Sequence, residues 1–301
     1  MKHLLMGIVL SGVAATAVGG QTAGSTADKP FDWTGQIPAG GRLRIADVRG
    51  DIRVTAATGD RVVVHADIRR RGPRGGTIAF DVVPDGNTVA ICARWADGPV
   101  CTTHGLREDN DSGDDDEGES AAADFTVQLP RTVRIQVETG NGRIDVAGTG
   151  SDVTASSGNG AIRVTGASGK VGVNSGNGDV IVEGAGGAVT ANTGNGIIRA
   201  YTNAGPVNAS TGNGNIDVRM EKLDARTDMR FDTGNGEITV AVPVGFSAEL
   251  DAETGHGSIR SDFPLQASGR IDPSHLHAVI GAGGARLRLI SGNGDLVLHK
   301  L

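Results

Sequence analysis

Residues 153–200 read VTASSGNGAIRVTGASGKVGVNSGNGDVIVEGAGGAVTANTGNGIIRA. Within this stretch a Ser or Thr followed by Gly-Asn-Gly recurs every eighteen residues. Eight such turns occur in the chain, and their first glycines are Gly140, Gly158, Gly176, Gly194, Gly212, Gly234, Gly255 and Gly292. The residues between the two glycines are Asn141, Asn159, Asn177, Asn195, Asn213, Asn235, His256 and Asn293. A fixed short period indicates one supersecondary unit stacked on copies of itself, so the fold is expected to be an array.

Aliphatic residues alternate with polar ones on both sides of each turn. Val153 and Ala155 precede one turn, and Ile162 and Val164 follow it. A period of two is the signature of a strand with one buried face. Glycine and asparagine tolerate the left-handed backbone region. Each repeat is therefore expected to carry two short strands joined by a Gly-Asn-Gly corner.

Two pairings fit this pattern: a meander of antiparallel hairpins, or a solenoid whose strands pair in parallel with their counterparts one repeat away. The solenoid is favoured because it stacks identical columns on themselves. We predict an all-β, single-domain parallel β-solenoid (a β-helix or β-roll) over residues 31–301, with about 18 residues per coil. Eight coils stacked at the usual strand spacing would form a rod roughly 40 Å long.

The first twenty residues resemble a targeting segment. Lys2 and His3 precede an apolar run, and Ala15-Thr16-Ala17 offers a small-residue cleavage site, so a signal peptide over residues 1–20 with cleavage near Ala17 is predicted. Residues 21–30 are expected to be a flexible segment. No later apolar stretch approaches the ~20 residues needed to span a membrane. The mature protein is expected in the periplasm or outside the cell, at the cell surface or in the medium.

Cys92 and Cys101 are the two cysteines of the chain. In an oxidising compartment they are expected to form a structural disulfide across a short loop. Free thiols are the alternative, and a catalytic cysteine assisted by His104 is a weaker one.

An acidic segment, EDNDSGDDDEGE, spans residues 108–119. It contains no apolar residue, so residues 104–121 are predicted to be a disordered loop. A calcium site on Asp109, Asp111 and Asp114–Asp116 stays open, although the spacing lacks a closing bidentate glutamate. The repeats offer no ligand ladder, because the column that begins Asp145, Arg163 is mixed, and no metal site is predicted there.

Two further motifs have structural interpretations. Arg49-Gly50-Asp51 matches a receptor-binding tripeptide, but residues 48–54 also align with residues 175–182 as a degenerate corner followed by a strand. His275 and His277 alternate on a predicted strand, and no third ligand accompanies them, so exposed polar positions are expected.

Enzymatic and nucleic-acid functions find little support. Parallel β-helices that act on polysaccharides use clustered carboxylates, whereas the acids after the corners, such as Asp179 and Glu237, are isolated, and Tyr201 is the only tyrosine. We therefore predict no catalytic residue and no cofactor. The net charge is −7, and the basic residues form no stripe beyond Arg69–Arg71 and Arg74, which excludes a nucleic-acid partner.

Several phrases resemble the bacterial putative-adhesin domain family, a family of unknown function. They are residues 125–130, 133–144, 238–243, 254–259 and 287–296. The resemblance covers roughly residues 40–301 apart from the acidic loop. It implies a Gly-Asn-Gly repeat β-solenoid, and it supplies no catalytic residue.

The sequence thus predicts an exported, non-enzymatic β-solenoid, an adhesin or cell-envelope binding protein that presents repetitive faces to a surface glycan or an envelope protein. A periplasmic structural or signalling protein of the envelope is the alternative. A polysaccharide-acting β-helix enzyme is the weaker alternative.

Overall fold

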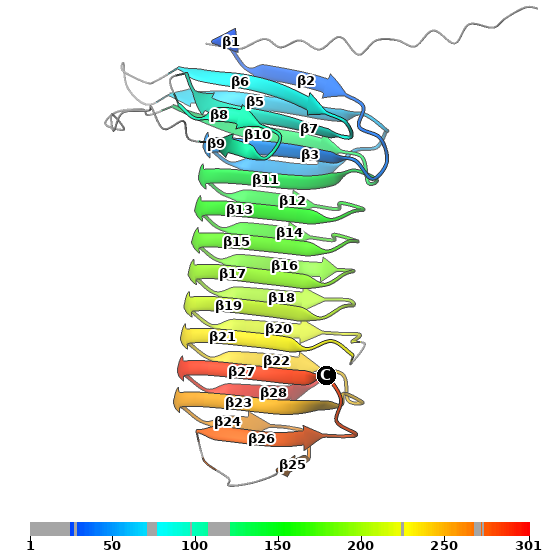
Figure 1. The fold of residues 1–301 in the computed structure, drawn as a ribbon, viewed down its shortest axis with the longest axis vertical. Coiled ribbons are helices and arrows are strands. Elements are labelled where there is room, and N and C mark those ends of the chain that lie inside the picture. Colours follow the sequence, from blue (N-terminus) through cyan, green and yellow to red (C-terminus); the bar gives the residue numbers. More distant parts are fainter. Residues whose placement is uncertain are drawn as a thin grey trace, which may run out of the picture.

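The structure is a computed structural model that describes residues 25–26, 29–70, 77–96, 98–107, 121–223, 226–267, 272 and 274–301. The described residues contain strands and no helix. A 14-stranded sheet (sheet A) and a 12-stranded sheet (sheet B) face each other along a straight rod, and a two-stranded hairpin lies at one end (Figure 1). The predicted all-β parallel solenoid is confirmed.

Each coil contributes one strand to sheet A and one to sheet B. The sheet A strands, in their order along the rod, are β3 (Arg42–Arg49), β11 (Arg134–Asn141), β13 (Val153–Asn159), β15 (Val171–Asn177), β17 (Val189–Asn195), β19 (Val207–Asn213), β21 (Met229–Asn235), β27 (Arg286–Asn293) and β23 (Ala248–His256). The sheet B strands are β4 (Ile52–Ala56), β12 (Ile144–Ala147), β14 (Ile162–Thr165), β16 (Val180–Ala185), β18 (Ile198–Thr202), β20 (Ile216–Met220), β22 (Ile238–Val242), β28 (Leu296–Lys300) and β24 (Ile259–Ser261). All of these neighbours pair in parallel.

The core is the narrow space between the two sheets. Ile144, Ile162, Val180 and Ile198 stack directly on one another in register, and all four are fully buried. Because successive residues of a strand point to opposite faces, every second side chain enters this core and the others form the outer faces. Burial of each such aliphatic side chain contributes about 1.5–3 kcal/mol.

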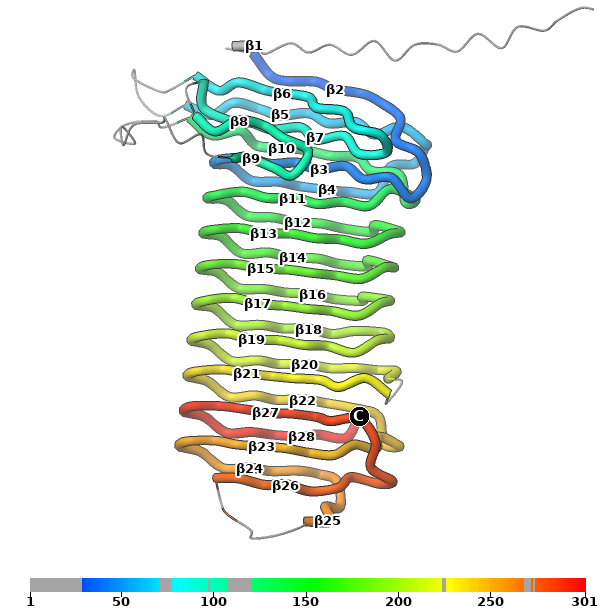
Figure 2. The backbone as a smooth tube through the Cα atoms, in the orientation of Figure 1, coloured from blue at the N-terminus to red at the C-terminus, as the bar shows by residue number. Residues whose placement is uncertain are grey.

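At the C-terminal end the coils do not follow the order of the chain. The last coil, β27–β28, lies between β21–β22 and β23–β24 (red between yellow and orange in Figure 2). The prediction that each coil stacks on its sequence neighbour is therefore wrong at this end. In sheet A, β23 of the displaced coil pairs antiparallel with β26 (His275–Ile280), which pairs antiparallel with β25 (Leu265–Ala267), whereas β24 is the last strand of sheet B. Antiparallel cover protects an edge that would otherwise expose unpaired backbone groups.

The N-terminal end carries a cap rather than additional full coils. We define the N-terminal cap as β1 (Ser25–Thr26), β2 (Phe31–Gly35), β5 (Val62–Arg70), β6 (Ile78–Asp85), β7 (Thr88–Trp95) and β10 (Ala121–Leu129). β7 continues sheet A beside β3, and β10 continues sheet B beside β4, both in parallel. The outer cap strands then pair antiparallel. Strands β5 to β10 lie between β3–β4 and β11–β12 in the sequence, although these two coils are neighbours in space.

Some predicted boundaries fall differently. Within the predicted acidic loop 104–121, residues Gly105–Arg107 form β9, which pairs with β8 (Val100–Thr102), and Ala121 begins β10. Residues 108–120, and with them the open calcium site, lie outside the described residues. The predicted signal peptide also lies outside them. Within the segment 21–30, predicted to be flexible, Ser25–Thr26 pair with β6.

Candidate functional site

The Ser or Thr of each corner motif points into the core. Thr193 is 5% exposed, and its hydroxyl donates to the carbonyl oxygen of Gly178 in the neighbouring coil at 2.8 Å. Equivalent bonds join Thr139 to Gly50, Ser157 to Gly142, Ser175 to Gly160, Thr211 to Gly196, Thr233 to Gly214, Ser291 to Gly236 and Thr254 to Gly294. We call this set the inner hydroxyl column. It gives a donor to the carbonyl groups of half-buried glycines, and carbonyl groups removed from water are costly to leave without a partner.

Both glycines of the motif are required by close packing. Gly160 has a φ of 155°, and a methyl group placed on it would lie 2.0 Å from the carbonyl oxygen of Gly142. A methyl group on Gly158 would lie 2.5 Å from the carbonyl oxygen of Gly140. Real carbon atoms do not approach an oxygen so closely, so any larger residue would separate the coils.

The asparagines of the corners form a ladder on the outside of the rod. From Asn159 onward, each side-chain amide donates to the amide oxygen of the preceding coil in the stack, at 2.7–2.9 Å, and the joined residues are Asn141, Asn159, Asn177, Asn195, Asn213, Asn235 and Asn293. His256 stands in register with Asn293 at one end, and Arg49 with Asn141 at the other. The predicted corner residues thus lie in a single line, and their side chains support one another as asparagine ladders do in other stacked β-structures.

Four consecutive coils carry no charge on the outer face of sheet A strands. We call the side of β13, β15, β17 and β19 that faces solvent the neutral face; it consists of Thr154, Ser156, Gly172, Asn174, Thr190, Asn192, Asn208 and Ser210. Asn192 donates to Asn174 at 2.9 Å. Ion pairs border it on both sides, Arg44 with Glu138 at 2.7 Å and Arg230 with Asp232.

The neutral face is flat and small. Its two columns are two residues apart, about 7 Å along the strand, and four coils span about 14 Å at the usual strand spacing. The area enclosed by these two lengths is well below the roughly 800 Å² per partner that a stable protein–protein interface buries. Its hydroxyl and amide groups can both donate and accept hydrogen bonds.

The outer face of sheet B differs in that it carries charges in these coils, and several of them form ion pairs. Arg163 lies 3.2 Å from Glu183, and Arg199 lies 3.7 Å from Asp217. The Tyr201 hydroxyl donates to Asp217 at 2.6 Å, and this bond, with partial burial, raises the pKa of Tyr201.

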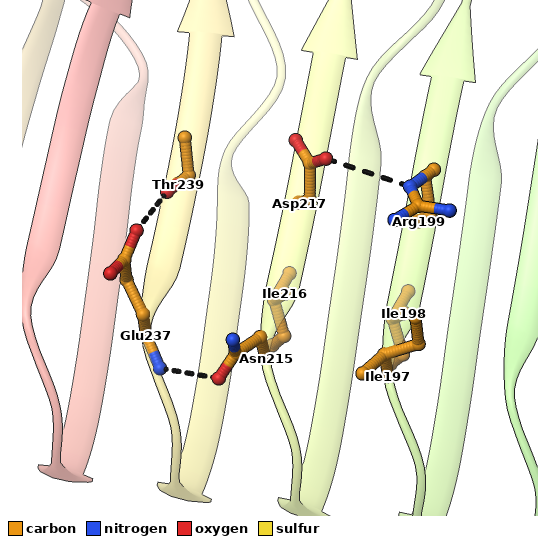
Figure 3. A pocket seen from close by; sticks show the side chains of 8 residues that line it. All are labelled: Ile197, Ile198, Arg199, Asn215, Ile216, Asp217, Glu237 and Thr239. Atoms are coloured by element: carbon orange, nitrogen blue, oxygen red, sulfur yellow. Dashed lines mark hydrogen bonds and ion pairs between the residues drawn. The ribbon is translucent and has the colours of Figure 1, made fainter.

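A shallow hollow of about 290 Å³ lies on this face across three coils (Figure 3). Its lining residues are Ile197, Ile198, Arg199, Asn215, Ile216, Asp217, Glu237 and Thr239. The two carboxylates already have partners, because Thr239 donates to Glu237 at 2.8 Å and Tyr201 donates to Asp217. The lining contains no Ser, Cys, His or Lys that could act as a nucleophile beside a base.

The other candidate residues have structural surroundings. A disulfide joins Cys92 to Cys101, with Cα atoms 5.8 Å apart, and fastens the β8–β9 hairpin to the N-terminal cap. His275 and His277 are both exposed on β26, and His275 approaches Asp251 at 3.5 Å. In the described part of the chain, no group of three or more His, Cys, Asp or Glu is arranged to hold a metal ion.

The Arg49-Gly50-Asp51 tripeptide lies at the corner between β3 and β4. The carboxylate of Asp51 accepts the backbone N–H of Arg143 at 2.8 Å, and its own N–H donates to Asp124 at 2.9 Å. The aspartate therefore connects neighbouring layers in this structure, as Asp179 does when it accepts the N–H of Ile197 at 3.0 Å.

Asp47 was missed by the sequence patterns, although it is the most unusual side chain of the first coil. It is 2% exposed and stands in register with Thr139, so it occupies the inner hydroxyl column. The N–H of Arg49 donates to its Oδ1 at 3.2 Å, whereas its Oδ2 has no donor. Burial raises the pKa of Asp47 well above its ordinary value, and the nearby Asp124 carboxylate adds to this effect.

Comparison with solved structures finds distant likenesses. A putative adhesin from Bacteroides fragilis is 13% identical, with 92% of this chain and 99% of that chain covered and a TM-score of 0.45. A putative adhesin from Parabacteroides distasonis is 10% identical, with 89% and 97% covered and a TM-score of 0.43. A putative cell adhesion protein from Clostridium sporogenes is 9% identical, with 91% and 100% covered and a TM-score of 0.29.

The search of curated proteins finds no match. The described residues include no helix long and apolar enough to cross a membrane. The family model of Toastrack DUF4097 matches residues 107–299, which is most of the rod. The chain belongs to the Toastrack DUF4097 family.

Proposed function

We propose that this protein is an exported, non-enzymatic binding protein of the cell envelope, of the adhesin type, whose neutral face holds an uncharged glycan polymer. The observation that carries the proposal is the absence of charge over four consecutive coils of sheet A. Threonine, serine and asparagine side chains there match the hydroxyl groups of a sugar chain in hydrogen-bonding capacity.

The size of the neutral face favours a weak, repeated contact. A net gain of about 1 kcal/mol for each of roughly four hydrogen bonds corresponds to a dissociation constant near 1 mM. A polymer that crosses several coils, or several protein molecules on one polymer, would raise the total affinity through effective concentration. The neutral face is less suited to a protein partner, because its area is much smaller than that of a standard protein–protein interface.

The amino-terminal pattern of residues 1–20 supports export. The hollow on sheet B supports a non-enzymatic role, because its carboxylates already have hydrogen-bond partners. The experiment that tests export is protease digestion of tagged protein on intact cells, with a lysed control. Digestion on intact cells supports a surface protein. Protection until lysis restricts the glycan to one inside the envelope, and recovery from the cytoplasm contradicts the proposal.

Binding is tested on a panel of neutral and acidic polysaccharides with matched variants. Thr190→Glu places a charge in the middle of the neutral face, and Thr165→Glu places the same charge on the outer face of sheet B. The first is expected to weaken binding to neutral polysaccharides at least tenfold, and the second to leave it unchanged. If only Thr165→Glu weakened binding, the binding site would lie on sheet B rather than on the neutral face.

Deletion of residues 171–206 removes two repeats while the repeat register is kept. Because the coils of the neutral face are proposed to contribute similar hydrogen bonds, the binding free energy is expected to fall in proportion to the coils lost. Full retention of affinity would indicate a discrete site elsewhere and would contradict the proposal.

A further inference from the structure

At the junction between the N-terminal cap and the first coil (β3–β4), the corner has the same geometry as in the rod, but Asp47 replaces the Ser or Thr of the inner hydroxyl column. The backbone of β10 occupies the place of a preceding coil, since β10 pairs in parallel with β4. A methyl group placed on Gly50 would lie 2.0 Å from the carbonyl oxygen of Ala123, just as one on Gly160 would lie 2.0 Å from Gly142 O. The Ala123 carbonyl therefore takes the position that a corner-glycine carbonyl has elsewhere.

The oxygen facing this carbonyl belongs to Asp47. In the coil β23–β24, a methyl group on Gly257 would lie 2.1 Å from Gly294 O and 3.0 Å from the Thr254 hydroxyl. The Thr254 hydroxyl donates to Gly294 O at 2.8 Å. At Gly50 the corresponding distances are 2.0 Å to Ala123 O and 2.7 Å to Asp47 Oδ2. These distances, with the register of Asp47 on Thr139, give Asp47 Oδ2 a position equivalent to that of the Thr254 hydroxyl.

A hydrogen bond between these two oxygens requires a proton, which the carbonyl cannot supply. We infer that Asp47 is present as a carboxylic acid that fastens the N-terminal cap to the rod by donating its proton to the Ala123 carbonyl, and that release of this proton to solvent loosens the cap. Asp47 then donates a hydrogen bond to the carbonyl of the neighbouring layer, as the hydroxyl groups of the inner hydroxyl column do. Unlike theirs, its hydrogen bond depends on pH.

The surroundings of Asp47 favour the neutral form. Burial is the largest influence, and the carboxylate of Asp124 on β10 acts in the same direction. The backbone N–H groups of Arg49 and Val48 oppose it, as does the Arg69 guanidinium on β5, which is itself paired with Asp124.

The direction of the pH dependence follows from linkage. The pKa of Asp47 is raised in the closed state, and an exposed aspartate titrates near 3.9. Below that value both states hold the proton, so the cap is fully fastened. Between the ordinary and the raised pKa, only the closed state keeps it, so the opening equilibrium rises by up to tenfold per pH unit.

Opening would have a structural consequence for the rod. If β10 leaves β4, the edge of sheet B loses its parallel partner at the first coil. An unpaired strand edge is a template for another strand, so fastening by Asp47 protects the rod from edge pairing in acidic surroundings.

Hydrogen–deuterium exchange of the full chain tests the inference. Opening of β10 is compared between about pH 5 and pH 7 in the wild-type protein, in Asp47→Asn and in Asp47→Thr, which restores the residue type of the other coils. Because the wild-type protein and the variants are compared at equal pH, their intrinsic exchange rates cancel in the ratio of the opening constants. The wild-type opening constant is expected to rise by up to a hundredfold relative to both variants over these two pH units. Identical pH dependence in all three proteins overturns the inference.

Two controls sharpen the result. Ser157→Asp places a carboxyl group in the same column within the rod, next to Gly142 O, and is expected to introduce a similar pH dependence there. Carbon-13 NMR of the aspartate carboxyl groups reports Asp47 directly in the wild-type protein, even if a variant does not fold. A pKa of Asp47 raised above that of an exposed aspartate supports the inference, and an unshifted or lowered pKa overturns it.

Discussion

Removal of one hydroxyl from the inner hydroxyl column should destabilise the rod by an amount that the structure allows us to calculate. Thr193→Val replaces the hydroxyl by a methyl group of nearly the same volume at a buried position, so no cavity forms. The carbonyl of Gly178 then loses its donor, which is 2.8 Å away in the native protein. The neighbouring backbone N–H groups cannot replace it, because those of Gly178 and Val180 donate instead to Asn195 O and Ile197 O.

The expected cost is the desolvation of one buried carbonyl group together with one lost hydrogen bond. Leaving a buried acceptor without a partner costs about 1–3 kcal/mol. We therefore expect Thr193→Val to lower the free energy of unfolding by about 2 kcal/mol. Thr193→Ser retains the donor, and serine occupies this position at Ser157 and Ser175, so it should cost well under about 1 kcal/mol.

The assay is urea unfolding at neutral pH, followed by circular dichroism, with both variants measured beside the wild-type protein. The comparison of Val with Ser isolates the hydroxyl, because both variants alter the same coil. If the two variants are equally stable within about 0.5 kcal/mol, the hydroxyl does not support the corner, and the role assigned to the inner column is refuted.

Three further predictions concern other parts of the chain. Gly160→Ala should cost at least about 2 kcal/mol in the same assay, because its new methyl group would meet Gly142 O at 2.0 Å and the backbone has a φ of 155°; a neutral effect would contradict the close packing of the corners. Cys101→Ser should destabilise the N-terminal cap by about 2–3 kcal/mol and leave the rod unchanged, as measured by hydrogen exchange of each part; equal losses in both would show that cap and rod unfold together. The His65 imidazole donates a hydrogen bond to the Asp32 carboxylate, which raises the pKa of His65, so the β2–β5 contact should be fully stabilised below the ordinary histidine pKa and weaken as pH rises through the raised value; NMR titration should show Asp32→Asn returning the pKa of His65 toward normal, and an unchanged pKa would show that Asp32 is not the cause of the shift.

Much of the rod could be predicted because the repeat exposes its own periodicity. The columns of aliphatic residues gave the two strands per coil, and the glycines gave the corners. The position of Asp47 stayed hidden, because Val48 and Arg49 stand where Gly and Asn stand in the other turns. The register of Arg49 on Asn141, once known, places Asp47 directly on Thr139.

The order of the coils could not be predicted from the repeat itself. Similar coils are interchangeable neighbours, and Asn293 extends the ladder from Asn235 as well as any other asparagine would, at 2.7 Å. Only the irregular coil carried a signal: it has His256 in place of asparagine and Ser261 in place of an aliphatic residue. Terminal repeats are commonly atypical because one side of them faces a cap, and this coil does lie at the end of the parallel stack.

The composition of the neutral face is not required by the fold, and this is the main argument for its use in binding. The inner positions and the corner are constrained by packing, as the contacts of Gly160 and Thr193 show. The outward positions are not so constrained, because the same coils carry Arg163, Arg199 and Asp217 on sheet B at positions where the strands stay in register. The outward strand positions carry charge on sheet B, whereas those of sheet A carry none over the same four coils. Stacking alone cannot explain that difference, whereas contact with an uncharged, repetitive ligand can.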